Sequence, residues 1–246
     1  MSIAEKLVTV AENIPKVYNA GYEKGKSEGG GGTNSYYDTF WDGTQQNGER
    51  TDYVNWSNGA VFTKDSFFPK YDIKPVKASS MFEQSGISID LEQRLKDCGV
   101  VLDFSKTTSG LNLFQNSAFY VLPEIDCSQA TSLQNWFYGA YNLHTIRLIK
   151  VHSGITTFYN AFLSCTRLKE VRFEGEITKS ISFKSCSELS TTSRESIFNA
   201  LATVETTQTL TLNNQVKILQ SQVDSANAKG WTVAGGTVVS EEEYYG

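Results

Sequence analysis

The side chains best able to do chemistry are two histidines and four cysteines. His144 and His152 stand eight residues apart, so they do not form the i, i+4 pair that places two metal ligands on one helix face. The cysteines are widely spread and include no C-x-x-C pair: Cys98, Cys127, Cys165 and Cys186. We therefore expect small buried free thiols in a protein made in a cytosol, with no metal ion and no other cofactor.

Two further sequence motifs bear on catalytic chemistry. Segment 20–27 ends in Gly25-Lys26-Ser27 and fits a permissive phosphate-binding loop, but that loop needs a strand before it and a helix after it. Here a predicted helix precedes the motif and glycines follow it, so we interpret the match as a coincidence. No G-x-S-x-G motif indicates a serine nucleophile. The sequence therefore predicts a protein that is not an enzyme.

The elements that would position any site belong to a short repeat. Its clearest copy reads Phe162-x-x-Cys165-x-x-Leu168-x-x-Val171-x-Phe173, with apolar or small residues at five offsets. Successive anchoring phenylalanines are 32, 23, 25 and 21 residues apart, which is the size of a leucine-rich-repeat unit. The other copies, some of them degenerate, begin at Phe82, Phe114, Phe137 and Phe183.

Each copy ends in an alternation that suits a short half-buried strand, and begins with a spacing that suits a helical turn or a tight loop. Neither piece buries its apolar side alone, so the copies must stack on one another. The fold class that we predict is α+β, with a short irregular leucine-rich-repeat solenoid over residues 81–190. The alternative is an aromatic-rich antiparallel sandwich with a chance period.

Composition excludes several classes of partner. The 246 residues carry a net charge of −5, which provides no basic surface for nucleic acid. No run of 18 apolar residues is present, so we predict no membrane insertion. Glu5 interrupts the apolar core that a signal peptide would need, so we expect none.

Residues 1–24 are predicted to form a coiled-coil-type helix, followed by a glycine-rich linker over residues 25–34. Pro15 should kink this helix. A narrow apolar stripe calls for a partner helix, so this segment is interpreted as an oligomerisation or docking helix; the alternative is a helix lying on its own domain. The stripe consists of Ile3, Leu7, Val10, Ile14 and Val17.

Residues 35–80 are dense in aromatic side chains, and we interpret them as an N-terminal cap that covers the open end of the repeats. The rival interpretation is a carbohydrate-binding face, because sugar rings stack on tryptophan and tyrosine. If the protein binds a glycan, the candidate contacts are Trp41, Trp56, Trp136 and Tyr138.

The C-terminal part is predicted to be a second cap over residues 191–239. A capping box at Thr192 and Glu195 should open a helix, and Leu210 to Leu212 should form a strand. A further helix and a strand at Trp231 should follow. The acidic segment 240–246 is predicted to be a mobile tail.

These patterns carry a family resemblance. The repeat of Phe162 to Phe173 resembles the BspA-like leucine-rich repeats of bacterial surface and phage proteins. The opening, from Ile3-Ala4-Glu5-Lys6-Leu7 to Gly25-Lys26, is similar to the start of structural proteins from tailed phages and prophages of Gram-positive gut bacteria. In such proteins Phe40-Trp41-Asp42 and Phe68-x-x-Tyr71 also recur between stem and repeats.

The resemblance implies a virion component made in the host cytoplasm, in the tail tip, baseplate or fibre, that displays its repeats for attachment to the host surface. Its expected partners are other copies of itself, as a homotrimer through the N-terminal helix, other virion proteins, and a host cell-wall glycan or surface protein. Three alternatives stay open: a capsid head fibre or decoration protein, a tail-associated glycan-cleaving enzyme, and a bacterial surface adhesin.

Overall fold

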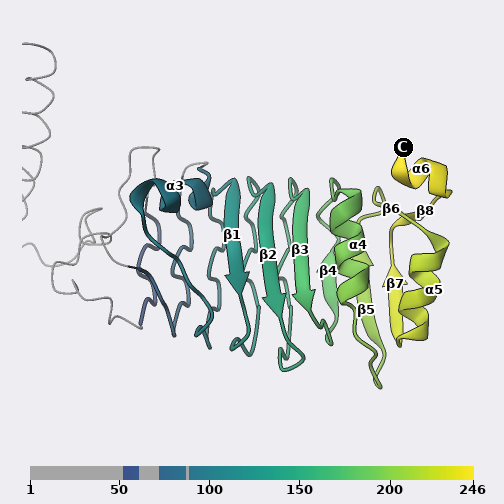
Figure 1. Cartoon of the computed structure of the whole chain (residues 1–246), viewed down its shortest axis with the longest axis horizontal. Helices are drawn as coiled ribbons and strands as arrows, with labels where there is room; N and C mark the ends of the chain where they lie inside the picture. The colour runs from purple at the N-terminus through teal and green to yellow at the C-terminus, as the bar shows by residue number, and fades with distance from the viewer. Residues whose placement is uncertain (1–51, 61–71, 87–88) are drawn as a thin grey trace, which may run out of the picture. The chain divides into compact units, whose positions relative to one another are not determined.

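The computed structural model describes residues 52–60, 72–86 and 89–246, which belong to a unit spanning Tyr36–Gly246. Its regular elements are short, and strands and helices lie side by side along the unit (Figure 1). In chain order they are α3 (Leu91–Cys98), β1 (Val121–Asp126), β2 (Thr145–Val151), β3 (Glu170–Gly175), β4 (Ile181–Phe183), α4 (Thr191–Ala200), β5 (Gln208–Leu212), β6 (Lys217–Ile218), α5 (Gln220–Ala228), β7 (Trp231–Ala234), β8 (Thr237–Val238) and α6 (Glu241–Tyr245).

Every strand pairing between the named strands of the described part is parallel, and none of these sheets closes into a barrel. The sheet orders are β1-β2-β3, β4-β5-β7 and β6-β8. In the first sheet Leu122 pairs with Ile146, which in turn pairs with Val171, so equivalent apolar positions of successive copies are neighbours. The expected α+β class is confirmed. The antiparallel sandwich is wrong for these strands, because hairpin-linked sheets would pair them antiparallel.

The anchoring phenylalanines form one column of stacked rings in the core. The ring centroids of successive pairs are 5.2, 5.8, 5.3 and 4.6 Å apart, from Phe82 through Phe114, Phe137 and Phe162 to Phe183. All five side chains are buried. Copies of unequal length therefore remain aligned at their anchors, because the extra residues are accommodated between the anchors and not within the column.

The anchoring phenylalanines from Phe82 to Phe162 each lie in a tight turn, and the backbone of each turn is hydrogen-bonded to the next turn. The backbone N–H of Phe137 donates to the carbonyl of Ala161 at 3.0 Å, and the N–H of Gly139 donates to the carbonyl of Leu163 at 2.8 Å. Asn135 and Gly139, two places before and after the anchor, have φ angles of 57° and 70°. Asparagine and glycine adopt this left-handed conformation at low cost, which is why they flank the phenylalanine.

The small residue three places after the anchor bonds to the preceding copy. The thiol of Cys165 donates to the carbonyl of Phe137 at 3.0 Å, and the hydroxyl of Ser85 donates to the carbonyl of Ser57 at 2.9 Å. All four cysteines are free, and three of them are buried. Burial raises the pKa of Cys165 to about 12, so its thiol stays protonated and unreactive. The prediction of small buried thiols is confirmed here.

Helices take the place of strands at both sides of the first sheet: α3 lies beside β1, and α4 packs against β3 (Figure 1). The hydroxyl of Ser193 on α4 accepts from the N–H of Val171 at 2.9 Å, and that of Ser196 accepts from the N–H of Phe173 at 2.8 Å. These serines accept hydrogen bonds from backbone N–H groups at the edge of β3 that would otherwise be free to pair with another strand. The sheet therefore ends at β3.

The repeat reaches further toward the N-terminus than the predicted boundary at residue 81. Ser57 occupies an anchor position, flanked by Asn55 at φ 56° and Gly59 at φ 70°. Its N–H donates to the carbonyl of Met81 at 2.8 Å, as in the later turns. Within the described residues, 52–60 are thus another copy. The sequence pattern concealed it, because serine replaces the phenylalanine.

The C-terminal end differs from the prediction in two respects. The N-cap of helix α4 is Ser190, whose side chain accepts from the N–H of Ser193, and the predicted capping box of Thr192 and Glu195 does not cap the helix. Residues 240–246, predicted as a mobile tail, contain helix α6. Tyr244 is only 3 % exposed there, beneath the guanidinium of Arg194 at 4.4 Å from its ring centroid. The burial of Tyr244 and its cation–π contact with Arg194 hold segment 240–246 against the domain, although most of its other side chains are acidic.

Candidate functional site

Two of the predicted glycan contacts are wrong. Trp136 is 0 % exposed, and its indole ring fills the space above Gly110, where a Cβ would come within 2.5 Å of it. Trp56 is 5 % exposed and packs edge-on against the rings of Tyr53 and Phe82. Buried rings cannot stack on a sugar from solvent, and both tryptophans belong to the core. Tyr138 is half-exposed, as expected of one residue flanking Phe137.

Several other predicted site residues lie outside the described residues. They are Trp41 and the five residues of the expected assembly helix: Ile3, Leu7, Val10, Ile14 and Val17. The role of the N-terminal helix therefore stays a prediction.

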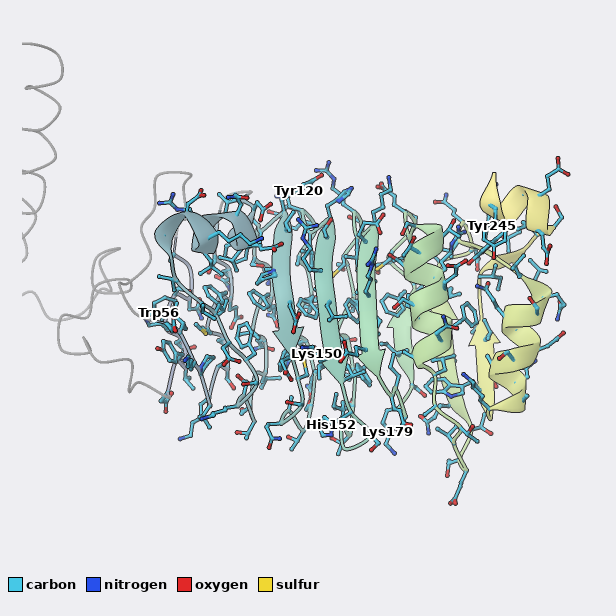
Figure 2. All side chains as sticks on the ribbon, viewed as in Figure 1. Trp56, Tyr120, Lys150, His152, Lys179 and Tyr245 are labelled. Carbon is cyan, nitrogen blue, oxygen red and sulfur yellow. The ribbon has the colours of Figure 1, made fainter. Side chains whose placement is uncertain are left out.

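One outer surface of the described unit is strongly charged. We call it the strand face, meaning the outward side chains of β1, β2 and β3: Glu124, Asp126, Arg147, Lys150, Arg172 and Glu174. Lys150 lies on β2 in the middle of the first sheet (Figure 2) and forms an ion pair with Glu124. In register, it stands between Asp126 and Glu174. The hydrogen bond to Glu124 and the nearby acidic charges raise the pKa of Lys150, so it stays cationic.

A charge cluster connects α3 with the strand face. Glu92 accepts from the ammonium of Lys96, one turn along the helix, and from Arg147 on β2, each at 2.6 Å. Burial acts to raise the pKa of Glu92, but the hydrogen bonds from Lys96 and Arg147 outweigh it, so the pKa lies below its ordinary value of 4.5. This cluster bridges across β1 between residues 55 positions apart in sequence.

A groove of about 360 Å³ runs between α3, segment 100–104 and β1. Its apolar wall is formed by Leu95, Val100, Leu102, Phe104 and Pro123, and carboxylates of Glu92, Asp103, Glu124 and Asp126 line its polar side. The groove adjoins the strand face, because Glu124 and Asp126 belong to both. A small ligand or a side chain of a partner would find apolar contact and acidic groups here.

Two of the carboxylates of this groove, Glu92 and Asp103, have the wrong electrostatics for a glycosidase acid. Burial acts to raise the pKa of Asp103, but hydrogen bonding with Ser105 outweighs it and leaves the pKa below its ordinary value. The pKa of Glu92 is also lowered. A general acid for glycoside cleavage needs a raised pKa, so that it holds a proton near neutral pH. The lowered pKa values therefore give these two groups no support as the catalytic acid.

Glu92→Gln should remove a pH-dependent contribution to stability. A carboxylate with a lowered pKa in the folded state stabilises the protein above its unfolded pKa of about 4.5, and this stabilisation is lost as the pH falls through the folded value. Because Arg147 and Lys96 are largely exposed, we expect the wild type to exceed the variant by only about 0.5–1 kcal/mol near neutral pH. Urea unfolding at about pH 7 and about pH 3 should show the difference shrinking toward zero at low pH.

The control is Glu205→Gln, at an exposed glutamate with no ion pair in the described part of the chain. Its difference from the wild type should be small and should not follow this pH course. A Glu92→Gln difference that persists at low pH would contradict the charge-cluster account.

A second outer surface is nearly free of charge. We call it the turn face: the residues three and two places before, and one and two places after, the anchors Ser57, Phe82, Phe114, Phe137 and Phe162. Of these twenty residues only Glu83 is charged, although 20 % of the chain is charged. All but Gly139 are at least partly exposed. The apolar ones with high exposure are Val54, Leu111, Tyr159 and Leu163.

Sequence reasoning missed the turn face, although a signal for it was present. The left-handed positions of the turns are filled by asparagine, glycine, serine or glutamine, as at Asn112 and Asn116 around Phe114. An Asn-x-Phe-x-Asn or Asn-x-Phe-x-Gly pattern is typical of a tight turn with two positive φ angles. This pattern predicts that the turn residues flanking the anchoring phenylalanine are exposed to solvent. The nearest predicted site residue is Tyr138, which lies on this face.

No group of three or more histidines, cysteines or acidic residues is arranged to hold a metal ion within ranges 52–60, 72–86 and 89–246. His144 instead stacks on Tyr120 with ring centroids 5.0 Å apart, and His152 bonds to the carbonyl of Ala130 at 2.9 Å. Among the same residues, no helix has the length and apolar character needed to span a bilayer.

No protein-family model, curated protein or solved structure was found to match this chain.

Proposed function

We propose that this chain is a non-enzymatic structural component of a phage particle, in the tail tip, baseplate or a fibre, whose repeat unit attaches to the host surface. The proposal combines the resemblance of the N-terminal opening and the repeat to phage structural proteins with the architecture of the described unit. It further proposes that the stacked copies form a leucine-rich-repeat solenoid.

One observation supports a binding role most strongly. The column of stacked phenylalanines holds successive copies in register, and the described unit has two outer surfaces of different chemistry, one charged and one nearly free of charge. Short parallel elements with a packed core give such surfaces a fixed spacing, as in repeat proteins that bind through extended faces. A weak site that is repeated on an oligomer gains strength by multivalency, which suits attachment to a repetitive cell surface.

The N-terminal helix would supply that oligomer. Its apolar stripe from Ile3 to Val17 has the a/d spacing of a coiled coil, and branched residues at both types of position are compatible with a trimer. The glycine-rich linker over residues 25–34 would let the repeat units reach separate contacts.

Light scattering should compare the solution mass of the full chain with that of a chain beginning at Asn34. We expect a trimer for the full chain and a monomer for the truncated one, because the apolar stripe calls for partner helices. In parallel, fluorescently labelled full chain should sediment with intact Gram-positive gut bacteria more strongly than the truncated chain.

Two monomers would overturn the self-assembly part and leave a peptide that docks onto another virion protein. Failure of both chains to sediment with cells would contradict host attachment and favour a decoration protein on the capsid.

A further inference from the structure

We infer that the turn face is a binding surface for a neutral, extended carbohydrate chain that runs along the stack of turns. This inference rests on the proposed function and names the chemistry of the host component that the protein would contact. It replaces Trp56 and Trp136, the two predicted tryptophan contacts that the structure describes, because both are buried.

The first argument is charge. The strand face carries acidic and basic side chains, and its cations Lys150 and Arg147 are paired with Glu124 and with Glu92 of α3. The turn face offers amides and aromatic or aliphatic groups, and its single carboxylate, Glu83, accepts from the side chain of Gln115 at 3.2 Å. Sugars without ionised groups bind through hydrogen bonds and through stacking of their C–H faces on aromatic rings. An anionic polymer would find no cation on the turn face, and a basic peptide would find only the carboxylate of Glu83.

The second argument is the placement of the rings. Tyr159 is 63 % exposed, and Leu163, in the same turn, is 39 % exposed. The carbonyl of Leu163 accepts from the N–H of Gly139, so the turn that carries the half-exposed Tyr138 lies directly beside it. The carbonyl of Tyr159 accepts from Asn135 in the same way, at 3.0 Å. Tyrosine presents a large rigid surface and a polar hydroxyl at little entropic cost, which suits sugar contact.

The third argument is spacing. Anchor rings of neighbouring turns are 5.2, 5.8 and 5.3 Å apart over the four turns from Phe82 to Phe162. Side chains at one position of successive turns, such as Leu111, Gln134 and Tyr159, therefore recur at about the strand spacing of a sheet, ~4.8 Å. This interval is close to the length of one sugar unit in an extended, equatorially linked chain. One sugar unit per turn can thus meet an equivalent set of groups.

The turns are also rigid before any ligand binds. The amide of Asn135 donates to the side-chain oxygen of Asn112 at 3.1 Å, which links neighbouring turns in addition to their backbone hydrogen bonds. Side chains held in place lose little conformational freedom on binding, so a shallow surface can still bind measurably.

The test uses the full chain and two neutral β-1,4-linked hexasaccharides, chitohexaose and cellohexaose, in calorimetric titrations. We expect at least one to bind and Tyr159→Ala to weaken that binding about tenfold, the loss that one stacked ring would cause. Tyr159→Phe should bind nearly as the wild type, because it keeps the ring.

The matched control is Tyr245→Ala, at a tyrosine 64 % exposed on α6 at the other end of the unit, away from Trp56 (Figure 2), and it should not change binding. The thermal midpoint of each variant shows that it is folded.

The inference is overturned if neither hexasaccharide binds, or if Tyr159→Ala binds as well as Tyr245→Ala.

Sedimentation with cells separates this failure from that of the proposed function. An excess of the hexasaccharide that binds should release the labelled protein from the cells, whereas protease-treated cells should keep it. Loss only after protease would show a protein receptor and refute the carbohydrate surface while host attachment stands. Hexasaccharide binding without any sedimentation would keep the surface and remove host attachment.

Discussion

Phe137→Ala is expected to lower the free energy of unfolding by about 3–5 kcal/mol, the usual cost of truncating a buried phenylalanine. The ring is fully buried and lies between two others, 5.8 Å from Phe114 and 5.3 Å from Phe162. Its removal opens a cavity in the middle of the column, and neighbouring turns cannot close it, because their backbones are hydrogen-bonded to one another. Urea unfolding followed by circular dichroism measures the loss.

The matched control for this variant is Tyr141→Ala. Tyr141 is an aromatic residue of the same copy that is 56 % exposed, so its truncation should change stability by no more than about 0.5 kcal/mol. Equal effects of the two variants would mean that the phenylalanine column does not hold the copies together. A loss for Phe137→Ala that appears as a separate early transition would show that the copies unfold independently of one another.

Gly175→Ala is expected to cost about 2–4 kcal/mol, because two penalties act together at this position. The φ of Gly175 is 98°, a conformation that an alanine adopts only under strain. A Cβ built there would lie 2.0 Å from the carbonyl oxygen of Val151, its strand partner on β2. The obstacle is backbone within a sheet, so β3 would have to move away from β2.

Gly99→Ala separates the two penalties. Gly99 ends helix α3 at φ 65°, but a Cβ there meets nothing within 4 Å. Its substitution should therefore show only the conformational penalty, about 1 kcal/mol. Chemical unfolding of both variants should rank Gly175→Ala clearly above Gly99→Ala. Similar losses would mean that the contact between Gly175 and Val151 is relieved without cost.

Much of the fold could be predicted because its repeat is local. Offsets from Phe162 identified buried residues, and so did those from Phe137 except the last, because a register shift in β2 buries Ile149 and leaves Leu148 half-buried. The small residues at Cys165 and Cys186 identified where neighbouring copies approach. The strands that follow Tyr120 and Leu143 were also expected, because hydrophobic periodicity reports which side of a short element faces the core.

The candidate site could be predicted only in small part. The anchor at Ser57 has no hydrophobic signal, so a whole copy was interpreted as a cap. Trp136 looked like a surface ring, and only its position over Gly110 buries it. The contact of Glu92 with Arg147 joins residues 55 positions apart, and no local pattern encodes it.

The sequence alone therefore determined the period of the repeat, its buried column and the absence of any recognisable catalytic motif. Only the tertiary structure decided which aromatic rings remain in solvent, which charges are paired, and that the segment after residue 239 folds onto Arg194 as α6. The physical reason is that periodicity records the burial of each residue within its own copy. The neighbours that a side chain meets across copies depend on how turns of unequal length align, and that alignment is set by packing and hydrogen bonding between the copies.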